Sequence, residues 1–171
     1  MLTYPIEPPD PRFVGQQWRE MWLHRLENAP HLARDWIEHQ RKDDFWKQGS
    51  IAEKYSDIEC PVFVVGGWAD AYTNAVPRLL EHLSVPRLGL IGPWAHMLPY
   101  EGVPGPAIGF LQEAVRWWDR WLKGVSNDIM DEPTLRVWIE EYVKPATFHA
   151  VRPGRWVAES EWPPPSVMAR R

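Results

Sequence analysis

Residues 61–70 have the sequence PVFVVGGWAD, and residues 88–96 have the sequence LGLIGPWAH. Each stretch begins with a short apolar run that ends at glycine, a pattern typical of a strand buried on both faces. A helix-length segment, residues 72–83, lies between them, and a long helical pattern follows the second. Strands that alternate with helices predict a parallel sheet covered by helices, which places the chain in the α/β class.

The long helix is expected to open at Gly105 and Pro106 and to stop at Gly124, which suits a left-handed C-terminal position. Its apolar residues fall into two neighbouring rows. The pattern favours core packing for the tryptophans, because they recur at helical spacing. The predicted stripe is Ile108, Leu111, Val115, Trp118 and Leu122, with Phe110, Ala114, Trp117 and Trp121 beside it.

The segments on either side have a different character. Residues 1–57 show helical patterns, the first capped by Asp10 and Pro11 and ending near Pro30. Their apolar stripes need an outside partner, so they are expected to form a lid or connector. From Thr134 the sequence alternates apolar and polar residues, which predicts half-buried strands over 134–140 and 155–158.

Composition excludes several classes of protein. The chain of 171 residues has a net charge of -4 and a pI near 5.9, which argues against a nucleic-acid partner. Its longest strongly apolar stretch, residues 61–69, is far shorter than the ~20 residues that span a bilayer. The single cysteine, Cys60, excludes an internal disulfide and a cysteine-rich zinc site, and it is compatible with a cytoplasmic location.

Two residues with catalytic potential follow the predicted strands. Asp70 lies past the first strand and His96 lies past the second. Because the carboxyl ends of parallel strands meet at one edge of a sheet, a carboxylate and an imidazole could come together there. These are the orienting acid and the general base of a nucleophile–His–Asp system, in the chain order nucleophile, acid, histidine. These residues alone are also compatible with an aspartate that forms a turn and a histidine that lies on the surface, neither of them catalytic.

Three motifs in order carry a resemblance to a known family. They are GGWADAY at 66–72, IGPWAH at 91–96 and EAVRWWDRWLKG at 113–124. Together they closely resemble the cocaine esterase and X-prolyl dipeptidyl-peptidase family of serine hydrolases, the S15-like peptidases. The resemblance extends over roughly residues 10–165 and implies an α/β-hydrolase fold. It makes Asp70 the acid and His96 the base of the catalytic triad, with no cofactor.

The resemblance also implies a division of the chain. Residues 1–57 would be the remnant of a helical cap, residues 58–126 the C-terminal part of the hydrolase core, and residues 132–171 the start of a truncated jelly-roll domain. The expected substrate is a small acyl ester or a peptide. The chain would then be part of a catalytic domain, with no membrane or nucleic-acid partner.

The expected nucleophile is absent from these residues. A G-x-S-x-G elbow should precede Asp70, and none of the serines has glycine at both flanking elbow positions. The oxyanion-hole residues of the family would also lie upstream. We therefore expect the isolated chain to be inactive. An alternative is a non-catalytic fragment or subunit that binds or pairs with a separate N-terminal half.

Other residues invite weaker functional interpretations. Trp68 and Trp94 each precede a triad candidate by two positions and are candidates for the substrate pocket, with core packing as the equal alternative. His31, Asp35 and His39 share a helical face and suggest a metal site, but an exposed polar face has the same pattern. Substrate-binding carboxylates in the cap would be Glu38, Asp43 and Asp44, for which a solvated acidic face is the simpler interpretation.

Overall fold

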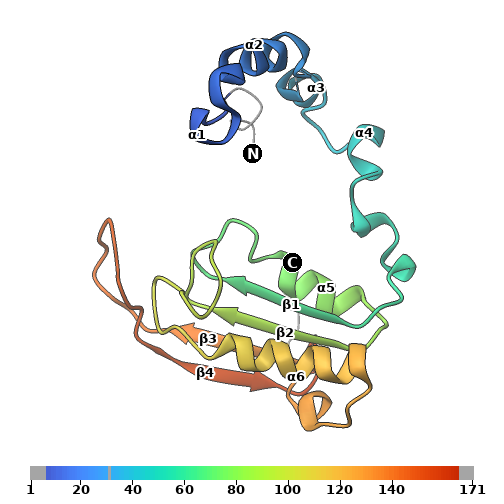
Figure 1. Cartoon of the computed structure of the whole chain (residues 1–171). Helices are drawn as coiled ribbons and strands as arrows, with labels where there is room; N and C mark the ends of the chain where they lie inside the picture. Colours follow the sequence, from blue (N-terminus) through green and yellow to red (C-terminus); the bar gives the residue numbers. More distant parts are fainter. Residues whose placement is uncertain (1–6, 31, 166–171) are drawn as a thin grey trace. The chain divides into compact units, whose positions relative to one another are not determined.

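The computed structural model describes residues 7–30 and 32–165 (Figure 1). The chain divides into two compact units, Met1–Glu53 and Lys54–Arg171. Within the described residues, no helix has the length and apolarity needed to cross a membrane.

The first unit consists of short helices. Asp10 caps the first of them by accepting a 2.8 Å hydrogen bond from the Arg12 backbone N–H, which confirms the predicted start. Asp43 caps the last α-helix through the Phe45 N–H in the same way. The elements are α1 (Pro11–Val14), η1 (Gly15–Gln17), α2 (Trp18–Asn28), α3 (Leu32–Glu38), α4 (Asp44–Lys47) and η2 (Ile51–Glu53).

The described helical residues of this unit include no buried apolar side chain. Met21, Leu23 and Trp36 are each more than a third exposed. Aromatic contacts, such as Phe45 against His39 and against Trp46, hold the short helices locally. A unit that buries so little apolar surface gains little hydrophobic stabilisation of its own. Its role as a lid or connector stays a prediction.

The second unit is a four-stranded sheet with helices on its faces (Figure 1). The strands run in the order β1-β2-β3-β4. The first three are parallel, and β4 is antiparallel to β3. The strands are β1 (Val62–Gly67), β2 (Arg87–Gly92), β3 (Leu135–Glu140) and β4 (Gly154–Glu159). The predicted α/β class with a mostly parallel sheet is confirmed.

Helices cover both faces of this sheet. From α5 (Ala75–His82), Val76 and Leu80 pack against Ile91 on one face. From α6 (Phe110–Lys123), Trp117 packs against Leu88 on the other face. Alternate residues of β2 therefore enter different cores, as the two-residue period of a strand requires. Two short 3-10 helices complete the unit, η3 (Tyr55–Asp57) and η4 (Asp128–Asp131).

The last two strands extend this same sheet. Leu135 of β3 is buried beside Leu80 and Ile91, and Val137 packs against that cluster. The strands expected over 134–140 and 155–158 are present, but this arrangement does not confirm a jelly-roll start. An alternating pattern identifies a half-buried strand without indicating which sheet it joins.

The face that α6 presents to the sheet differs from the prediction. The helix begins at Phe110 rather than at Pro106, and Gly124 ends it with a φ of 69°, as expected. Trp117 is buried. Of the predicted stripe, Ile108 lies before the helix, and Leu111, Val115, Trp118 and Leu122 are more than half exposed. The two apolar rows are neighbours on the helix, and the row with Phe110 and Trp117 packs against Phe63 of the sheet. We call the exposed residues Leu111, Val115, Trp118 and Leu122 the outer row of α6.

Strand β1 is also less buried than its sequence predicts. Its residues from Val62 to Gly66 are only half-buried, whereas the residues of β2 from Leu88 to Gly92 are buried. The physical reason is position, because β2 lies between two strands, whereas β1 pairs with β2 alone in the part of the chain that the structure describes. The prediction of burial on both faces is therefore correct for β2 and wrong for β1 in this chain.

Gly67, at the end of β1, provides a test of this packing. A Cβ atom there would collide with the carbonyl group of Trp94. We expect Gly67→Ala to lower the free energy of unfolding by about 1–3 kcal/mol, the usual cost of overpacking. Chemical denaturation measures the change. The matched control is Gly105→Ala, whose Cβ would meet its nearest atoms at 3.6 Å, so an equal loss in both variants would contradict the account.

Candidate active site

Two loops start from the same edge of the sheet. Gly67 pairs with Gly92 in the parallel register of β1 and β2, so the loops that follow these strands begin side by side. Backbone hydrogen bonds connect them. The N–H of Trp68 donates to the Gly92 carbonyl at 2.9 Å, and the N–H of Ala69 donates to the Trp94 carbonyl at 3.1 Å.

These loops bring Asp70 and His96 together, as the sequence predicts for residues past neighbouring parallel strands. The His96 Nδ1 atom lies 2.8 Å from Asp70 Oδ2. An ionised carboxylate can only accept, so Nδ1–H is the donor, and in the neutral form of the imidazole Nε2 then carries the free lone pair. The side chain of Asp70 is 12% exposed and that of His96 is 81% exposed. An enclosed acid thus orients an imidazole whose other nitrogen is accessible.

The surroundings of Asp70 keep its carboxyl ionised. The Tyr72 backbone N–H donates to Oδ1 at 2.9 Å, and His96 donates to Oδ2. These hydrogen bonds lower the pKa of Asp70 below its ordinary value, the one from Tyr72 more than the one from His96. The stability they contribute is present above the ordinary aspartate pKa, and it is lost as the pH falls through the lowered value.

Thr73 fixes the loop that carries Asp70, and sequence analysis missed it. Its side chain is buried, and its hydroxyl lies within hydrogen-bond distance of the carbonyls of Gly67 and Asp70. The Asp70 N–H also donates to the Gly67 carbonyl at 3.0 Å, so a backbone N–H and the Thr73 hydroxyl both hold the turn closed. A threonine shortly after an aspartate in a turn is a signal for such bonding, although a weak one.

The two tryptophan candidates have different surroundings. Trp94 is buried, and its indole N–H donates to the Pro106 carbonyl at 2.8 Å. Its ring fills space that side chains at Gly92 and Gly102 would occupy, so it supports the His96 loop from the core. Trp68 is 46% exposed, and its indole N–H donates to the Trp138 carbonyl at 2.6 Å.

A cavity of about 410 Å³ adjoins the Asp70–His96 pair. Its lining comes from the end of β1, the loop after β2 and the start of α6, and includes Gly66, Met97, Pro99 and Phe110. Trp94 also lines it, whereas Trp68 does not. None of the described lining residues is serine, cysteine or threonine, so a nucleophile would have to enter from elsewhere.

The metal interpretation gains no support. Within residues 7–30 and 32–165, no group of three or more His, Cys, Asp or Glu side chains could hold a metal ion. His31 lies outside the described residues. His39 Nδ1 instead lies 2.7 Å from Asp43 Oδ2, and the Trp46 indole N–H donates to the His39 carbonyl. Glu38 forms an ion pair with Arg34, and Asp44 with Lys47.

Comparison with known proteins identifies the class. The family model described as X-Pro dipeptidyl-peptidase (S15 family) matches residues 3–98, more than half of the chain, and the chain belongs to this family of hydrolases. Two putative Xaa-Pro dipeptidyl-peptidases are similar to it over 131 residues. The one from Bacillus cereus is 28% identical and the one from Bacillus anthracis 27%, each over 74% of this chain.

The match extends over only part of these relatives. The chain spans 20% of the Bacillus cereus protein and 19% of the Bacillus anthracis protein. Among solved structures, a CocE/NonD family hydrolase from Staphylococcus aureus superposes with a TM-score of 0.63 at 19% identity, over 87% of this chain and 25% of that one. A second structure of that hydrolase gives 0.59, over 94% and 27%. At this level of identity the superposition shows a shared fold.

Removal of His96 tests how the Asp70 carboxyl is held. We expect His96→Ala to raise the pKa of Asp70 only part of the way to its ordinary value, because the larger cause, the Tyr72 N–H, remains. The carboxyl ¹³C resonance of Asp70, followed by NMR through a pH titration, measures this. An unchanged pKa would show that the imidazole does not donate to the carboxylate.

Removal of the Thr73 hydroxyl tests the closure of the loop. Thr73→Val leaves two interior carbonyls without that donor, and we expect it to lower the free energy of unfolding by about 1–3 kcal/mol. Thr73→Ser retains the hydroxyl and should lose clearly less. Chemical denaturation of the original chain and the two variants measures these free energies. A serine variant as unstable as the valine variant would refute the role of the hydrogen bonds.

Proposed function

We propose that this chain supplies the acid and the base of a serine hydrolase that cleaves acyl ester or peptide and amide bonds. Asp70 is the orienting acid, and His96 is the general base. The observation that carries the proposal is the 2.8 Å contact between His96 Nδ1 and Asp70 Oδ2 at the carboxyl edge of the sheet, with the other imidazole nitrogen accessible.

The chemistry follows from this arrangement. His96 Nε2 takes the proton of a serine hydroxyl as the oxygen attacks the substrate carbonyl carbon. The imidazolium is stabilised by the Asp70 carboxylate and then gives the proton to the leaving alcohol or amine as its bond to the carbonyl carbon breaks. Water repeats the sequence on the acyl-enzyme and releases the acid. No metal or cofactor takes part in these steps.

The nucleophile is proposed to come from sequence outside these 171 residues. Among the residues that the structure describes, β1 pairs only with β2, which supports this, because a further parallel strand paired at its other side would end at the same edge as Asp70 and His96. A serine in the turn after such a strand would face the 410 Å³ cavity. The outer row of α6, exposed and apolar, suits coverage by the same segment.

The proposed substrate classes are based on the descriptions of similar proteins. The two Bacillus proteins are described as putative Xaa-Pro dipeptidyl-peptidases, so release of X-Pro dipeptides is one proposed activity, and ester hydrolysis is the other.

A second candidate function is a non-catalytic subunit or fragment that pairs with a separate N-terminal half. The same two features favour it. A strand edge with no partner strand among the described residues and an exposed apolar helix row are typical of surfaces that a partner covers. Co-purification with a chain that carries a G-x-S-x-G elbow would support it. A monomer that binds no such chain would count against it.

Activity measurements test the catalytic proposal. The chain alone should turn over neither a p-nitrophenyl ester nor an X-Pro p-nitroanilide, because loss of a triad nucleophile costs on the order of a million-fold in turnover. The chain joined to the segment encoded directly upstream should be active where that segment carries the elbow. In this extended protein, His96→Ala and Asp70→Ala should lower turnover by roughly 10⁴-fold or more.

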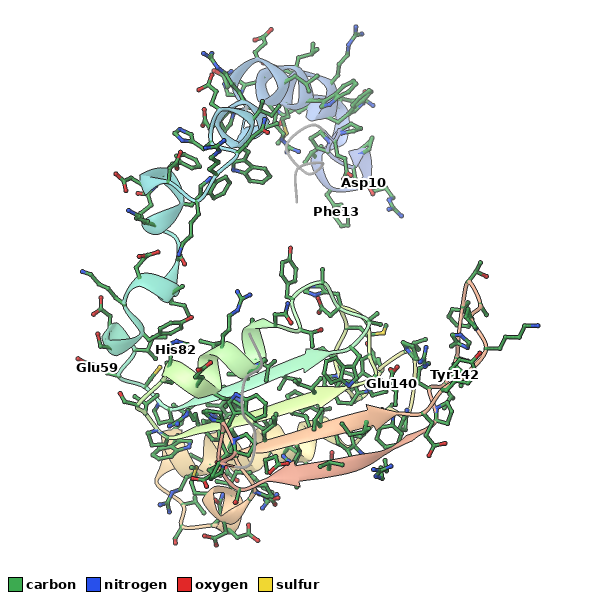
Figure 2. All side chains as sticks on the ribbon, turned by 180° about the vertical axis from the view of Figure 1, so that it is seen from behind. Asp10, Phe13, Glu59, His82, Glu140 and Tyr142 are labelled. Carbon is green, nitrogen blue, oxygen red and sulfur yellow. The ribbon has the colours of Figure 1, made fainter. Side chains whose placement is uncertain are left out.

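The control is His82→Ala in the same protein. His82 is half exposed at the end of α5, where Figure 2 shows it at the other end of the sheet from Glu140 and Tyr142, and it does not line the cavity of the site. Its loss should leave turnover unchanged. Full activity in His96→Ala would overturn the assignment of the base. Turnover by the chain alone that disappears in both His96→Ala and Asp70→Ala would overturn the need for an outside nucleophile.

A further inference from the structure

A second cavity, of about 580 Å³, lies at the same edge of the sheet. We call it the Trp68 cavity. The loops after β1 and β2 line one side of it, and the connection between β3 and β4, residues 141–153, lines the other. Ala95 and Met97, on either side of His96 in the sequence, line both this cavity and the one beside the Asp70–His96 pair. The two cavities therefore adjoin across the His96 loop.

One wall of the Trp68 cavity is a rigidly held indole. The Trp68 backbone N–H donates a hydrogen bond to the Gly92 carbonyl, and its indole N–H donates one to the Trp138 carbonyl. The backbone and the side chain of Trp68 are therefore both held in place. Almost half of the side chain remains exposed. An indole whose polar atom is already satisfied and whose ring is held in place offers a flat apolar surface at little further entropic cost.

The opposite wall is held by backbone hydrogen bonds. Gly105 pairs with Val151 in an isolated bridge, with the Gly105 N–H donating to the Ala150 carbonyl at 2.8 Å and the Arg152 N–H donating to the Gly105 carbonyl at 3.0 Å. Phe148, on this connection, is 68% exposed and lines the cavity. Figure 2 shows Glu140 and Tyr142 where the connection leaves the sheet. The lining of the cavity thus includes two aromatic residues, Trp68 and Phe148.

The polar groups of the cavity include an ion pair. Arg152 Nη2 lies 2.8 Å from Glu140 Oε2, with each side chain about a quarter exposed. The pair cancels its own charge, so it attracts neither an anion nor a cation strongly. The Arg152 Nε atom is buried without a hydrogen-bond partner among the described residues. The rest of the lining is mostly apolar and includes Met97, Val103 and Pro104, together with the polar residues Thr147 and His149.

We propose that the Trp68 cavity binds an aromatic ring of the substrate, stacked on Trp68. An aromatic group suits the site because ring pairs gain attraction beyond the area they bury, and the paired charges of Glu140 and Arg152 give no such advantage to a charged group. The proposal rests on the proposed function only in assigning the ring to a substrate of the Asp70–His96 site. The binding itself requires no catalysis.

Ligand-observed saturation-transfer NMR on the full chain tests this directly, with benzyl alcohol as the probe and 2-propanol as the non-aromatic comparison. We expect saturable binding of benzyl alcohol alone. Trp68→Ala should weaken it about fivefold to tenfold, in line with the loss of one ring pair. Trp68→Phe retains a flat ring and should bind nearly as well as the original chain.

The matched control is Trp118→Ala, which removes a tryptophan of similar exposure from the outer row of α6. It should leave the affinity unchanged. Absence of saturation transfer to benzyl alcohol would overturn the proposal, as would equal affinities of the original chain and Trp68→Ala. Far-ultraviolet circular dichroism verifies that each variant is folded. The hydrolase proposal is tested separately, by the turnover of the extended protein and its His96→Ala variant. A failure of ring binding can therefore be distinguished from a failure of the hydrolase proposal.

Discussion

The in-register pairing of the parallel strands β1 and β2 is the constraint on which the site depends. It aligns Gly67 with Gly92 and starts the loops of Asp70 and His96 at one edge of the sheet. The loops can then approach closely because position 67 has no side chain, where a Cβ would meet the Trp94 carbonyl. Asp70 and His96 reach hydrogen-bond distance as a consequence of this backbone arrangement.

Around this edge some residues support the loops and others remain accessible to a substrate. Buried groups, Thr73 and Trp94, fix the loops from below, whereas the imidazole of His96 and the indole of Trp68 remain accessible. Buried supports with accessible reactive groups are expected of a catalytic site, because the reactive groups must reach the substrate while packed neighbours hold them in a fixed geometry. The half-buried state of β1 shows that the support is open on one side, at the edge where the nucleophile is proposed to join.

The meeting of Asp70 and His96 could be predicted from the sequence because it needs only two short apolar runs and the rule that parallel strands end at one edge. The packing face of α6 could not be predicted, since its two apolar rows are neighbours and only the sheet decides which one is buried. Membership of β3 in the same sheet depends on the core of Leu80 and Ile91, which alternation along the strand does not encode. Thr73 was missed because its partners are backbone carbonyls, which the sequence does not distinguish.

The tautomer of the neutral His96 imidazole tests the central claim most directly. Long-range ¹H–¹⁵N correlation NMR on the chain, at a pH where the imidazole is neutral, identifies which ring nitrogen carries the proton. The account predicts the Nδ1–H form, held by Asp70, in the original chain and its loss in Asp70→Ala. A predominant Nε2–H form in the original chain would contradict the claim that Asp70 orients His96 to act as a base.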